Sequence, residues 1–477
     1  MLTYSFDDRG TEALYEYLYR QIKDDISNNK LKPKEKLPSK RALAKHLDIS
    51  TITVENAYSQ LMAEGYIYSV PRSGFYVSDI SADDYKFSDT SQYKPRTYKK
   101  DAKDNNNQET ILDSPKYFMD FVNNNTAPDN FPFTRWAKLI RETMAEERDN
   151  LMIKSPSLGV YQLRCAIVNY LYQFRGMDVE PEQVVVGAGT EYLYGLIIQL
   201  LGHESKYAVE DPGYQKIARI YKANKVKCVH IPLDNEGINI DALEESAADV
   251  VHITPSHHFP TGIVTPISRR HELLTWALKS EKRYIIEDDY DSEFRLLGKP
   301  IPALQSIDMS NKVIYINTFS KSLTSTIRIS YMVLPKPLIE RYNKELSFYA
   351  CTVSNFEQYT LAKFLERGYL EIHINRMRNY YRKTRDILLE NIMKRKDDKK
   401  INIMEEDAGL HFLLQVDTKI SDKQLVMRAA ENGINVSCLS QYYYDRSNIK
   451  DHILVINYSG VDTEYIEEGV DRLFEVF

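Results

Sequence analysis

The chain has 477 residues, of which 43% are hydrophobic and 27% charged, and its formal net charge is -6. This length exceeds what one compact core usually holds, so it predicts about two to three domains. No apolar run is long enough to span a bilayer, and residues 1–20 contain acids and lack the apolar core of a secretory signal. The four cysteines are far apart, which predicts neither a disulfide framework nor a zinc site. We therefore expect an intracellular, cytoplasmic protein without a membrane partner.

The first two predicted helices lie before residue 48. Apolar residues recur at every fourth position in the first helix, at Leu14, Leu18, Ile22 and Ile26. This spacing predicts an amphipathic helix. Further along, Pro38 ends the preceding segment, and Ser39 is placed to cap a short second helix.

A third helix and a hairpin follow. Asp48 lies in a tight turn, Ser50 or Thr51 caps the third helix, and Gly65 ends it. Two short helices joined by a tight turn predict a helix-turn-helix. Residues 66–77 then predict a β-hairpin, because two short aromatic and β-branched runs flank a Pro-Arg-Ser-Gly turn. Together these elements predict a winged helix.

Positive charge is concentrated near the second predicted helix, although the chain as a whole is acidic. The cations there are Lys32, Lys34, Lys36, Lys40 and Arg41, against the single acid Glu35. A local basic face can bind phosphates on an otherwise acidic protein. A small helical domain used only for dimer contact would need neither this run nor an arginine at the tip of the hairpin. Charge and fold together favour nucleic-acid binding.

Residues 1–78 resemble the GntR type of winged helix. The resemblance is carried by LPSKRALAKHLDIS, TITVENAYSQLMAEGYI and the hairpin RSGFYV. It implies that the third helix enters the major groove of double-stranded promoter DNA. Base edges would be contacted by Thr51, Thr53 and Asn56, and phosphates or the groove by Lys40, Arg41 and Arg72. Ser73 and Gly74 at the hairpin tip would also belong to the DNA-binding set. Many relatives carry arginine where this chain has Thr51, so the base preference stays open.

Residues 79–115 are polar and charged and contain few aliphatic side chains. Such a segment cannot bury much apolar surface. We expect a flexible linker that lets the DNA-binding domain move independently of residues 116–477.

Residues 116–477 alternate periodic helices with short β-branched runs. The predicted strands lie at 183–186, 250–253, 284–286 and 313–316. Strands that alternate with helices predict an α/β fold with a mainly parallel sheet covered on both faces. In such sheets, ligands gather at the carboxyl ends of the strands.

Three motifs follow predicted strands. Residues 187–191, Gly-Ala-Gly-Thr-Glu, open a helix whose backbone N–H groups can face a phosphate. Asp288, Asp289 and Tyr290 offer carboxylates and a phenol at one strand end. Residues 317–321 end in Lys321, and Arg328 comes seven residues later. An amine for a Schiff base, followed by donors for a phosphate, is what pyridoxal phosphate requires.

These motifs occur in the order of a fold-type I aminotransferase, with EDPGY at 210–214, TPSHHFPTG at 254–262 and EDDYDSEF at 287–294. Residues 116–477 resemble such a domain, which would include a small C-terminal α+β subdomain. The whole chain is similar to the MocR/GabR regulators, which join a GntR winged helix to an aminotransferase-like domain.

The resemblance implies roles for individual residues. Lys321 would form the Schiff base with pyridoxal 5'-phosphate, Asp288 would pair with the pyridine nitrogen, and Tyr290 would hydrogen-bond the ring hydroxyl. Phosphate would be bound by Gly189, Thr190, Thr318, Ser320 and Arg328, and Tyr214 would stack on the ring. The residues themselves give no preference for Asp288 over Asp289, so that choice rests on the resemblance.

The chain departs from the aminotransferase pattern at two places. Residues 259–262 are Phe-Pro-Thr-Gly, whereas aminotransferases have an asparagine that contacts the ring hydroxyl. That contact is either missing or made by His257 or His258. No arginine lies at 455–460, where many aminotransferases bind the substrate carboxylate, which leaves Arg446 as a candidate substitute.

We therefore expect a transcription regulator that binds promoter DNA and responds to pyridoxal phosphate or to its adduct with an amino acid or amine. Its target genes would serve vitamin B6 synthesis or amino-acid metabolism. The alternative is a catalytically active aminotransferase with an accessory DNA-binding domain, and transamination half-reactions stay open. The resemblance also implies a homodimer.

Overall fold

The computed structural model describes residues 2–6, 9–10, 12–79, 117–123, 128–296, 301–395, 400–406 and 409–477. The chain divides into two compact units, Met1–Gln108 and Glu109–Phe477. The predicted linker, residues 79–115, lies outside the described residues apart from its first position. No helix in the described part of the chain is long and apolar enough to cross a membrane.

The N-terminal unit is the predicted winged helix. Its helices are α1 (Leu14–Ser27), α2 (Lys40–Leu47) and α3 (Thr51–Ala63), and its strands are β1 (Lys36–Leu37), β2 (Ile67–Val70) and β3 (Gly74–Val77). The apolar face of α1 is buried at Leu18 and Ile22, and it packs with Leu43 of α2 and Val54 and Leu61 of α3. One apolar side of each helix thus builds a single small core.

Local capping sets where α2 and α3 begin. The Ser39 hydroxyl accepts from the Ala42 N–H at 3.2 Å, and the Ser50 hydroxyl accepts from the Thr53 N–H at 3.0 Å. Ser50 is therefore the N-cap of α3, and Thr51 is its first residue. The two-residue strand β1, which pairs with β3, was not predicted because it is too short to show any periodicity.

The larger unit is built on an eight-stranded sheet with the order β5-β12-β11-β10-β9-β6-β7-β8. The strands are β5 (Val184–Gly187), β6 (Lys206–Asp211), β7 (Lys227–Asp234), β8 (Gly237–Ile238), β9 (Val250–Ile253), β10 (Tyr284–Asp289), β11 (Val313–Thr318) and β12 (Ser330–Val333). The run β11-β10-β9-β6-β7 is parallel, and β12 lies antiparallel between β11 and β5. The mainly parallel sheet is confirmed.

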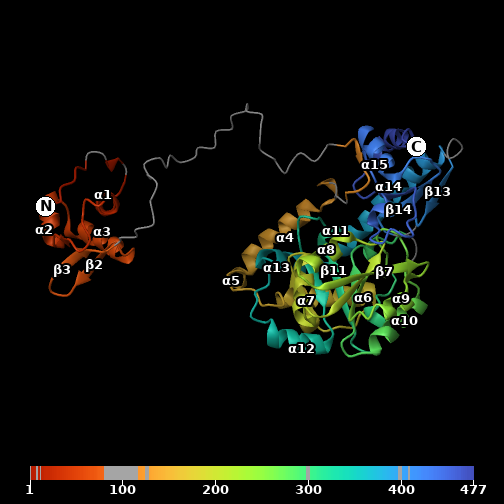
Figure 1. The fold of residues 1–477 in the computed structure, drawn as a ribbon, viewed down its shortest axis with the longest axis horizontal. Helices are drawn as coiled ribbons and strands as arrows, with labels where there is room; N and C mark the ends of the chain where they lie inside the picture. Colours follow the sequence, from red (N-terminus) through yellow and green to blue (C-terminus); the bar gives the residue numbers. More distant parts are fainter. Residues whose placement is uncertain are drawn as a thin grey trace. The chain divides into compact units, whose positions relative to one another are not determined.

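Helices cover both faces of this sheet (Figure 1). They are α4 (Phe133–Glu146), α5 (Arg148–Leu151), α6 (Tyr161–Arg175), α7 (Thr190–Leu201), α8 (Gln215–Ala223), α9 (Ile240–Glu245), α10 (Ile267–Leu278), α11 (Phe319–Ser322), α12 (Lys336–Glu345) and α13 (Asn355–Glu366). Along β11, Tyr315 packs in the cluster of α6 and α13, whereas Ile314 and Ile316 pack in the cluster of α7 and α12. Because both faces are covered, every residue of β11 is buried.

A smaller α+β part follows at the C-terminus, where α14, α15, β13 and β14 group together in blue in Figure 1. Its sheet has the order β13 (Ile401–Met404), β14 (His411–Val416), β17 (Ile453–Asn457) and β16 (Ser437–Cys438), all antiparallel. Its helices are α14 (Tyr369–Met393), α15 (Asp422–Glu431) and α16 (Ile466–Phe474). A short parallel pair, β4 (Met119–Asp120) and β15 (Ile434–Asn435), ties the start of the unit to this part.

Candidate functional sites

A cavity of about 960 Å³ opens where the parallel strands end. It is lined by Glu210 of β6, Thr254 after β9, Asp288 of β10 and Thr318 of β11. This is the edge at which open α/β sheets bind ligands. All nine predicted cofactor residues line the cavity: Gly189, Thr190, Tyr214, Asp288, Tyr290, Thr318, Ser320, Lys321 and Arg328.

Lys321 enters the cavity from the short helix after β11. Thr318 ends the strand and caps this helix, because its hydroxyl accepts from the Ser320 N–H at 3.1 Å. Lys321 lies half-buried one turn further on. Burial lowers the pKa of its amine to about 8, with Asp291 opposing the shift. An appreciable share of the amine is therefore neutral and nucleophilic near neutral pH.

Asp288 presents one free carboxylate oxygen to the same cavity. Its Oδ2 accepts from the Tyr194 hydroxyl at 2.5 Å and lies 3.4 Å from Nε2 of His252. Its Oδ1 is buried without a hydrogen-bond partner among the described residues. A buried carboxylate oxygen without a partner is costly, so this site is suited to a ligand that carries a proton on nitrogen.

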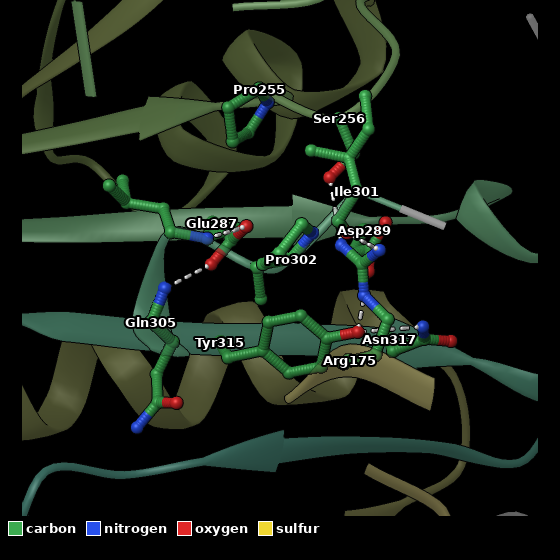
Figure 2. A network of polar contacts seen from close by, with 12 residues as sticks. Arg175, Pro255, Ser256, Glu287, Asp289, Ile301, Pro302, Gln305, Tyr315 and Asn317 are labelled. Atoms are coloured by element: carbon green, nitrogen blue, oxygen red, sulfur yellow. Dashed lines mark hydrogen bonds and ion pairs between the residues drawn. The ribbon is translucent and has the colours of Figure 1, made fainter. Parts of the chain in front are cut away.

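Asp289 points to the opposite face of the sheet, because successive side chains of a strand alternate. Its Oδ2 lies 2.8 Å from Arg175 Nη2 and accepts from the Tyr315 hydroxyl at 2.6 Å. Figure 2 shows this buried network, in which Glu287 accepts from backbone N–H groups. The two neighbouring aspartates therefore differ in environment. Asp288 lines the cavity, and Asp289 neutralises a buried arginine.

The start of α7 forms a cradle. Gly189 precedes the helix with φ +92, and a Cβ on it would lie 2.5 Å from Nη2 of Arg328. Only glycine suits this position, since the backbone is left-handed and the space is occupied. The cradle also contains an acid, because Glu191 pairs with Arg328 at 2.7 Å and with Lys216. Partial burial opposes ionisation, but hydrogen bonds from Lys216 and Arg328 lower the pKa of Glu191 to about 2.

Two aromatic side chains lie at the cavity. Tyr214 directly precedes α8, is 50% exposed, and its ring lies edge-on to Phe259 at 6.1 Å. The Tyr290 hydroxyl lies 3.3 Å from Nδ1 of His257. Neither His257 nor His258 lines the cavity, and their Nδ1 atoms lie within hydrogen-bond distance of Asp291 and Thr261, respectively. Of the candidates for the ring-hydroxyl contact, only Tyr290 faces the cavity.

Three residues of this site were not predicted from the sequence. Tyr194 and His252 hold Asp288, and Glu191 faces the cationic side chains of the cradle. Tyr194 lies one helical turn after Thr190, and His252 is a polar residue inside a buried apolar strand. Both patterns are signals that could have been used. At the end of β17, Asn457 lines the cavity where an aminotransferase-type arginine was sought, and Arg446 lines it as well.

The predicted DNA-binding residues lie on α2, α3 and the hairpin tip. Arg41, Thr51, Asn56 and Arg72 are exposed. Three of the others, Lys40, Thr53 and Ser73, have side-chain partners within the protein. Thr53 is half-buried with its hydroxyl 2.8 Å from that of Ser50, and Lys40 pairs with Glu55 at 2.7 Å.

The hairpin tip has a constrained backbone. Arg72 has φ +64 and Gly74 φ +123, and the Ser73 hydroxyl lies 2.6 Å from that of Tyr76. One residue of α3 was missed. Ile52 stands between the two predicted threonines, and 69% of it is exposed. An exposed apolar side chain at the start of a recognition helix is suited to contact a thymine methyl.

Two protein-family models match separate parts of the chain. The description "Bacterial regulatory proteins, gntR family" matches residues 14–77, and "Aminotransferase class I and II" matches residues 119–473. The chain is also similar in fold to the kynurenine aminotransferase of Pyrococcus horikoshii, solved in complex with PMP, with a TM-score of 0.66 and 24% identity. That similarity covers 76% of this chain and 91% of the other.

Curated relatives match most of the chain's length. The uncharacterized HTH-type transcriptional regulator YdeL of Bacillus subtilis (strain 168) is 39% identical over 96% of both chains. The HTH-type pyridoxine biosynthesis transcriptional regulator PdxR of Corynebacterium glutamicum is 29% identical, over 89% of this chain and 88% of the relative. The fold and these matches define a transcriptional regulator with a GntR helix-turn-helix and an aminotransferase-like domain. The chain belongs to the MocR/GabR family of such regulators.

Proposed function

We propose that this regulator binds pyridoxal phosphate in the Lys321 cavity and that occupancy of the cavity changes its affinity for promoter DNA. The observation that carries the proposal is one cavity that combines a half-buried amine of lowered pKa with the free carboxylate oxygen of Asp288. The proposed division is a DNA-binding domain at 1–78, a linker at 79–115 and an effector domain at 116–477. We place the protein in the cytoplasm, where its DNA target lies.

The donor set of the cavity fits this cofactor. When bound, pyridoxal phosphate supplies an aldehyde that condenses with a primary amine, releasing water, and an electron-withdrawing pyridinium ring. Lys321 provides the amine. Asp288 holds a proton on the ring nitrogen, with Tyr194 and His252 fixing its orientation. Gly189 and Thr190 offer N–H groups at the start of α7, and Arg328 offers positive charge.

The remaining lining residues have positioning roles. Tyr214 stacks on the ring face, and Tyr290 donates to the ring hydroxyl. Ser320 donates to phosphate. Thr318 acts mainly by capping the helix that carries Lys321, because its hydroxyl already accepts from the Ser320 N–H and from the Ser330 hydroxyl.

The effector is pyridoxal phosphate itself or its adduct with an amino acid or amine. The similarity to a regulator named for pyridoxine biosynthesis supports the first version and control of vitamin B6 genes. Amino-acid metabolism is the second candidate target. In either version, the effector acts only if it binds one arrangement of the protein more tightly than another.

DNA binding is proposed for the exposed face of the winged helix. Arg41 and Arg72 contact phosphate or the groove, and Thr51 and Asn56 contact base edges, with Ile52 against a thymine methyl. Lys40 and Thr53 contact DNA once they release Glu55 and Ser50, their partners within the protein. Ser73 and Gly74 shape the hairpin tip. A homodimer suits paired half-sites on the operator.

A working aminotransferase is the second candidate function, because Lys321 and Asp288 are sufficient for exchange of amino groups. Asn457 stands at the β17 end in place of a carboxylate-binding arginine, which favours sensing over turnover.

The deciding experiment is a gel shift of the purified full chain on its own upstream DNA, with and without pyridoxal phosphate and with a panel of amino acids. We expect a specific shift whose midpoint moves when the effector is added. Absence of any shift would reject the regulator, and steady turnover of an amino donor and a keto acid at ordinary enzyme rates would favour the aminotransferase.

A further inference from the structure

A buried imidazole lies directly behind the wall of the Lys321 cavity. His257 is 3% exposed and does not line the cavity, but its Nδ1 lies 3.3 Å from the hydroxyl of Tyr290, which does. The same Nδ1 lies 2.9 Å from Oδ2 of Asp291, which is 2% exposed. One ring nitrogen of His257 therefore faces a carboxylate and a phenol at once.

The carboxylate decides which nitrogen of His257 carries the proton. A carboxylate only accepts hydrogen bonds, so Nδ1 is protonated and donates to Asp291. In the neutral ring, Nε2 is then the bare nitrogen, and it is buried without a hydrogen-bond partner among the described residues. Because Nδ1 already carries a proton, it cannot accept a hydrogen bond from Tyr290. The phenol proton of Tyr290 is therefore free to point elsewhere.

The Tyr290 hydroxyl keeps that proton. Burial raises the pKa of Tyr290 well above its ordinary value, and the nearby carboxylate of Asp291 raises it further. The phenol oxygen can accept from Nδ1–H of His257, while its O–H turns toward the cavity that Tyr290 lines. A hydroxyl whose oxygen is held from behind in this way is a directed donor.

The C-terminal part of the unit holds the imidazole from another side. Gly409 packs so closely on His257 that a Cβ on this glycine would overlap Cε1 of the ring. The Gly409 carbonyl in turn accepts from the Tyr458 hydroxyl at 2.6 Å. The ring of His411 lies beside that of His257, with centroids 4.6 Å apart, and burial lowers the pKa of His411 well below its ordinary value, so it is neutral. The position of the imidazole thus depends on both Asp291 and the C-terminal part.

We propose that His257 is a positioning residue, which is held by Asp291 and Gly409 and directs the Tyr290 hydroxyl to donate to the ring hydroxyl of the cofactor. This inference rests on the proposed function, because the cofactor is pyridoxal phosphate bound in the Lys321 cavity. His257 acts through Tyr290 and does not itself touch the cofactor. Through this contact, the C-terminal part influences cofactor affinity from Gly409, which lies outside the lining of that cavity.

The test is an equilibrium titration of the full chain with pyridoxal phosphate, read by cofactor absorbance. Tyr290→Phe and His257→Leu should each weaken binding by about tenfold or more, because each removes the same directed hydrogen bond. The double variant should bind no more weakly than Tyr290→Phe alone, since His257 acts only through that hydroxyl. Losses that multiply in the double variant, or wild-type affinity in His257→Leu, would overturn the proposal.

A conservative variant separates hydrogen bonding from packing. His257→Asn should bind within about twofold of the wild type, because its side-chain amide N–H replaces Nδ1–H toward Asp291 and Tyr290. The matched control His271→Leu makes the same change at an exposed position on α10 and should leave the affinity unchanged. If His257→Asn binds as weakly as His257→Leu, the imidazole only fills space and the proposal fails.

Gly409→Ala gives a second test that leaves the imidazole intact, and it decides the matter if His257→Leu does not fold. The added methyl displaces the ring, so we expect pyridoxal phosphate to bind about threefold to tenfold more weakly. In the Tyr290→Phe background the same change should have no effect, and an equal loss in both backgrounds would contradict the proposal. Thermal unfolding verifies the fold of each variant. A wild-type chain that takes up no pyridoxal phosphate rejects the proposed function separately.

Discussion

The DNA-binding face and the Lys321 cavity are built in opposite ways. The face comes from one continuous segment, residues 40–74, whose exposed side chains are positioned by two local caps at Ser39 and Ser50. The cavity is assembled from the ends of four strands and the starts of α7, α8 and α11, which are spread over more than a hundred residues. A local segment can be interpreted from its own pattern, whereas an assembled cavity needs the sheet to bring its parts together.

The largest effect that separates the two regions is expected for Lys321→Ala. The variant should lose the absorbance band of lysine-bound pyridoxal phosphate and every effector response, because the condensing amine is gone. Basal DNA binding should persist, since the winged helix has its own core. Spectroscopy and a gel shift measure the two outcomes. A reducible cofactor linkage retained in the variant would mean that another lysine is used.

The next contrast is between two adjacent carboxylates. Asp288→Asn should weaken cofactor binding by about tenfold to a hundredfold, since the amide does not hold a proton on the ring nitrogen. Asp289→Asn should instead lower stability by about 3–5 kcal/mol, because it leaves the buried Arg175 without its countercharge. Cofactor titration and thermal unfolding measure these effects. The distinction between cavity and core fails if both variants lose cofactor equally at full stability.

Arg41→Ala/Arg72→Ala tests the other region. Loss of two phosphate contacts should weaken DNA binding by about tenfold or more at moderate salt. It should also reduce the slope of log K against log salt by about 2. Uptake of pyridoxal phosphate should not change. Arg141→Ala removes one exposed arginine on α4 and is the control for the loss of a single positive charge. Parallel loss of cofactor in the double variant would indicate a structural role for these arginines.

The pH dependence of cofactor uptake tests the burial of Lys321. Its neutral amine is the reactive form, and a pKa of about 8 leaves roughly a tenth of it neutral at pH 7 and half at pH 8. The uptake rate should therefore rise about fivefold between pH 7 and 8 and level off above pH 9. Hexylamine in solution, with an ordinary amine pKa, should continue to accelerate past pH 9. A protein profile that follows hexylamine would show that the lysine is not perturbed.

The smallest expected effect is a gain in affinity for pyridoxal phosphate. Glu191→Gln removes the carboxylate that pairs with Arg328 and Lys216, so a phosphate no longer competes with it for these cations. We expect pyridoxal phosphate to bind about threefold to tenfold more tightly, measured by equilibrium titration. Glu182→Gln, an exposed acid before β5, is the matched control. Weaker binding in Glu191→Gln would mean that this acid helps to build the cradle.

The sequence by itself determined the class of the protein, because its strongest signals are local. Helix periodicity, the serine at each cap and the alternation of strands with helices depend on neighbouring residues, and the winged helix and mainly parallel sheet follow from them. The strand ends depend less on local pattern. The predicted strand at 284–286 extends to Asp289 in β10, because paired backbone continues past the apolar run.

Tertiary structure alone decided which polar residues share a site. The alternation of side chains along a paired strand directs Asp288 to the cavity and Asp289 to Arg175, although the two residues are identical in type. Contacts across the fold also brought Glu191 to Arg328, and Arg446 lines the same cavity as Lys321. Such pairings depend on sheet order and on the faces that elements present, and a single sequence does not specify either for residues more than a hundred positions apart.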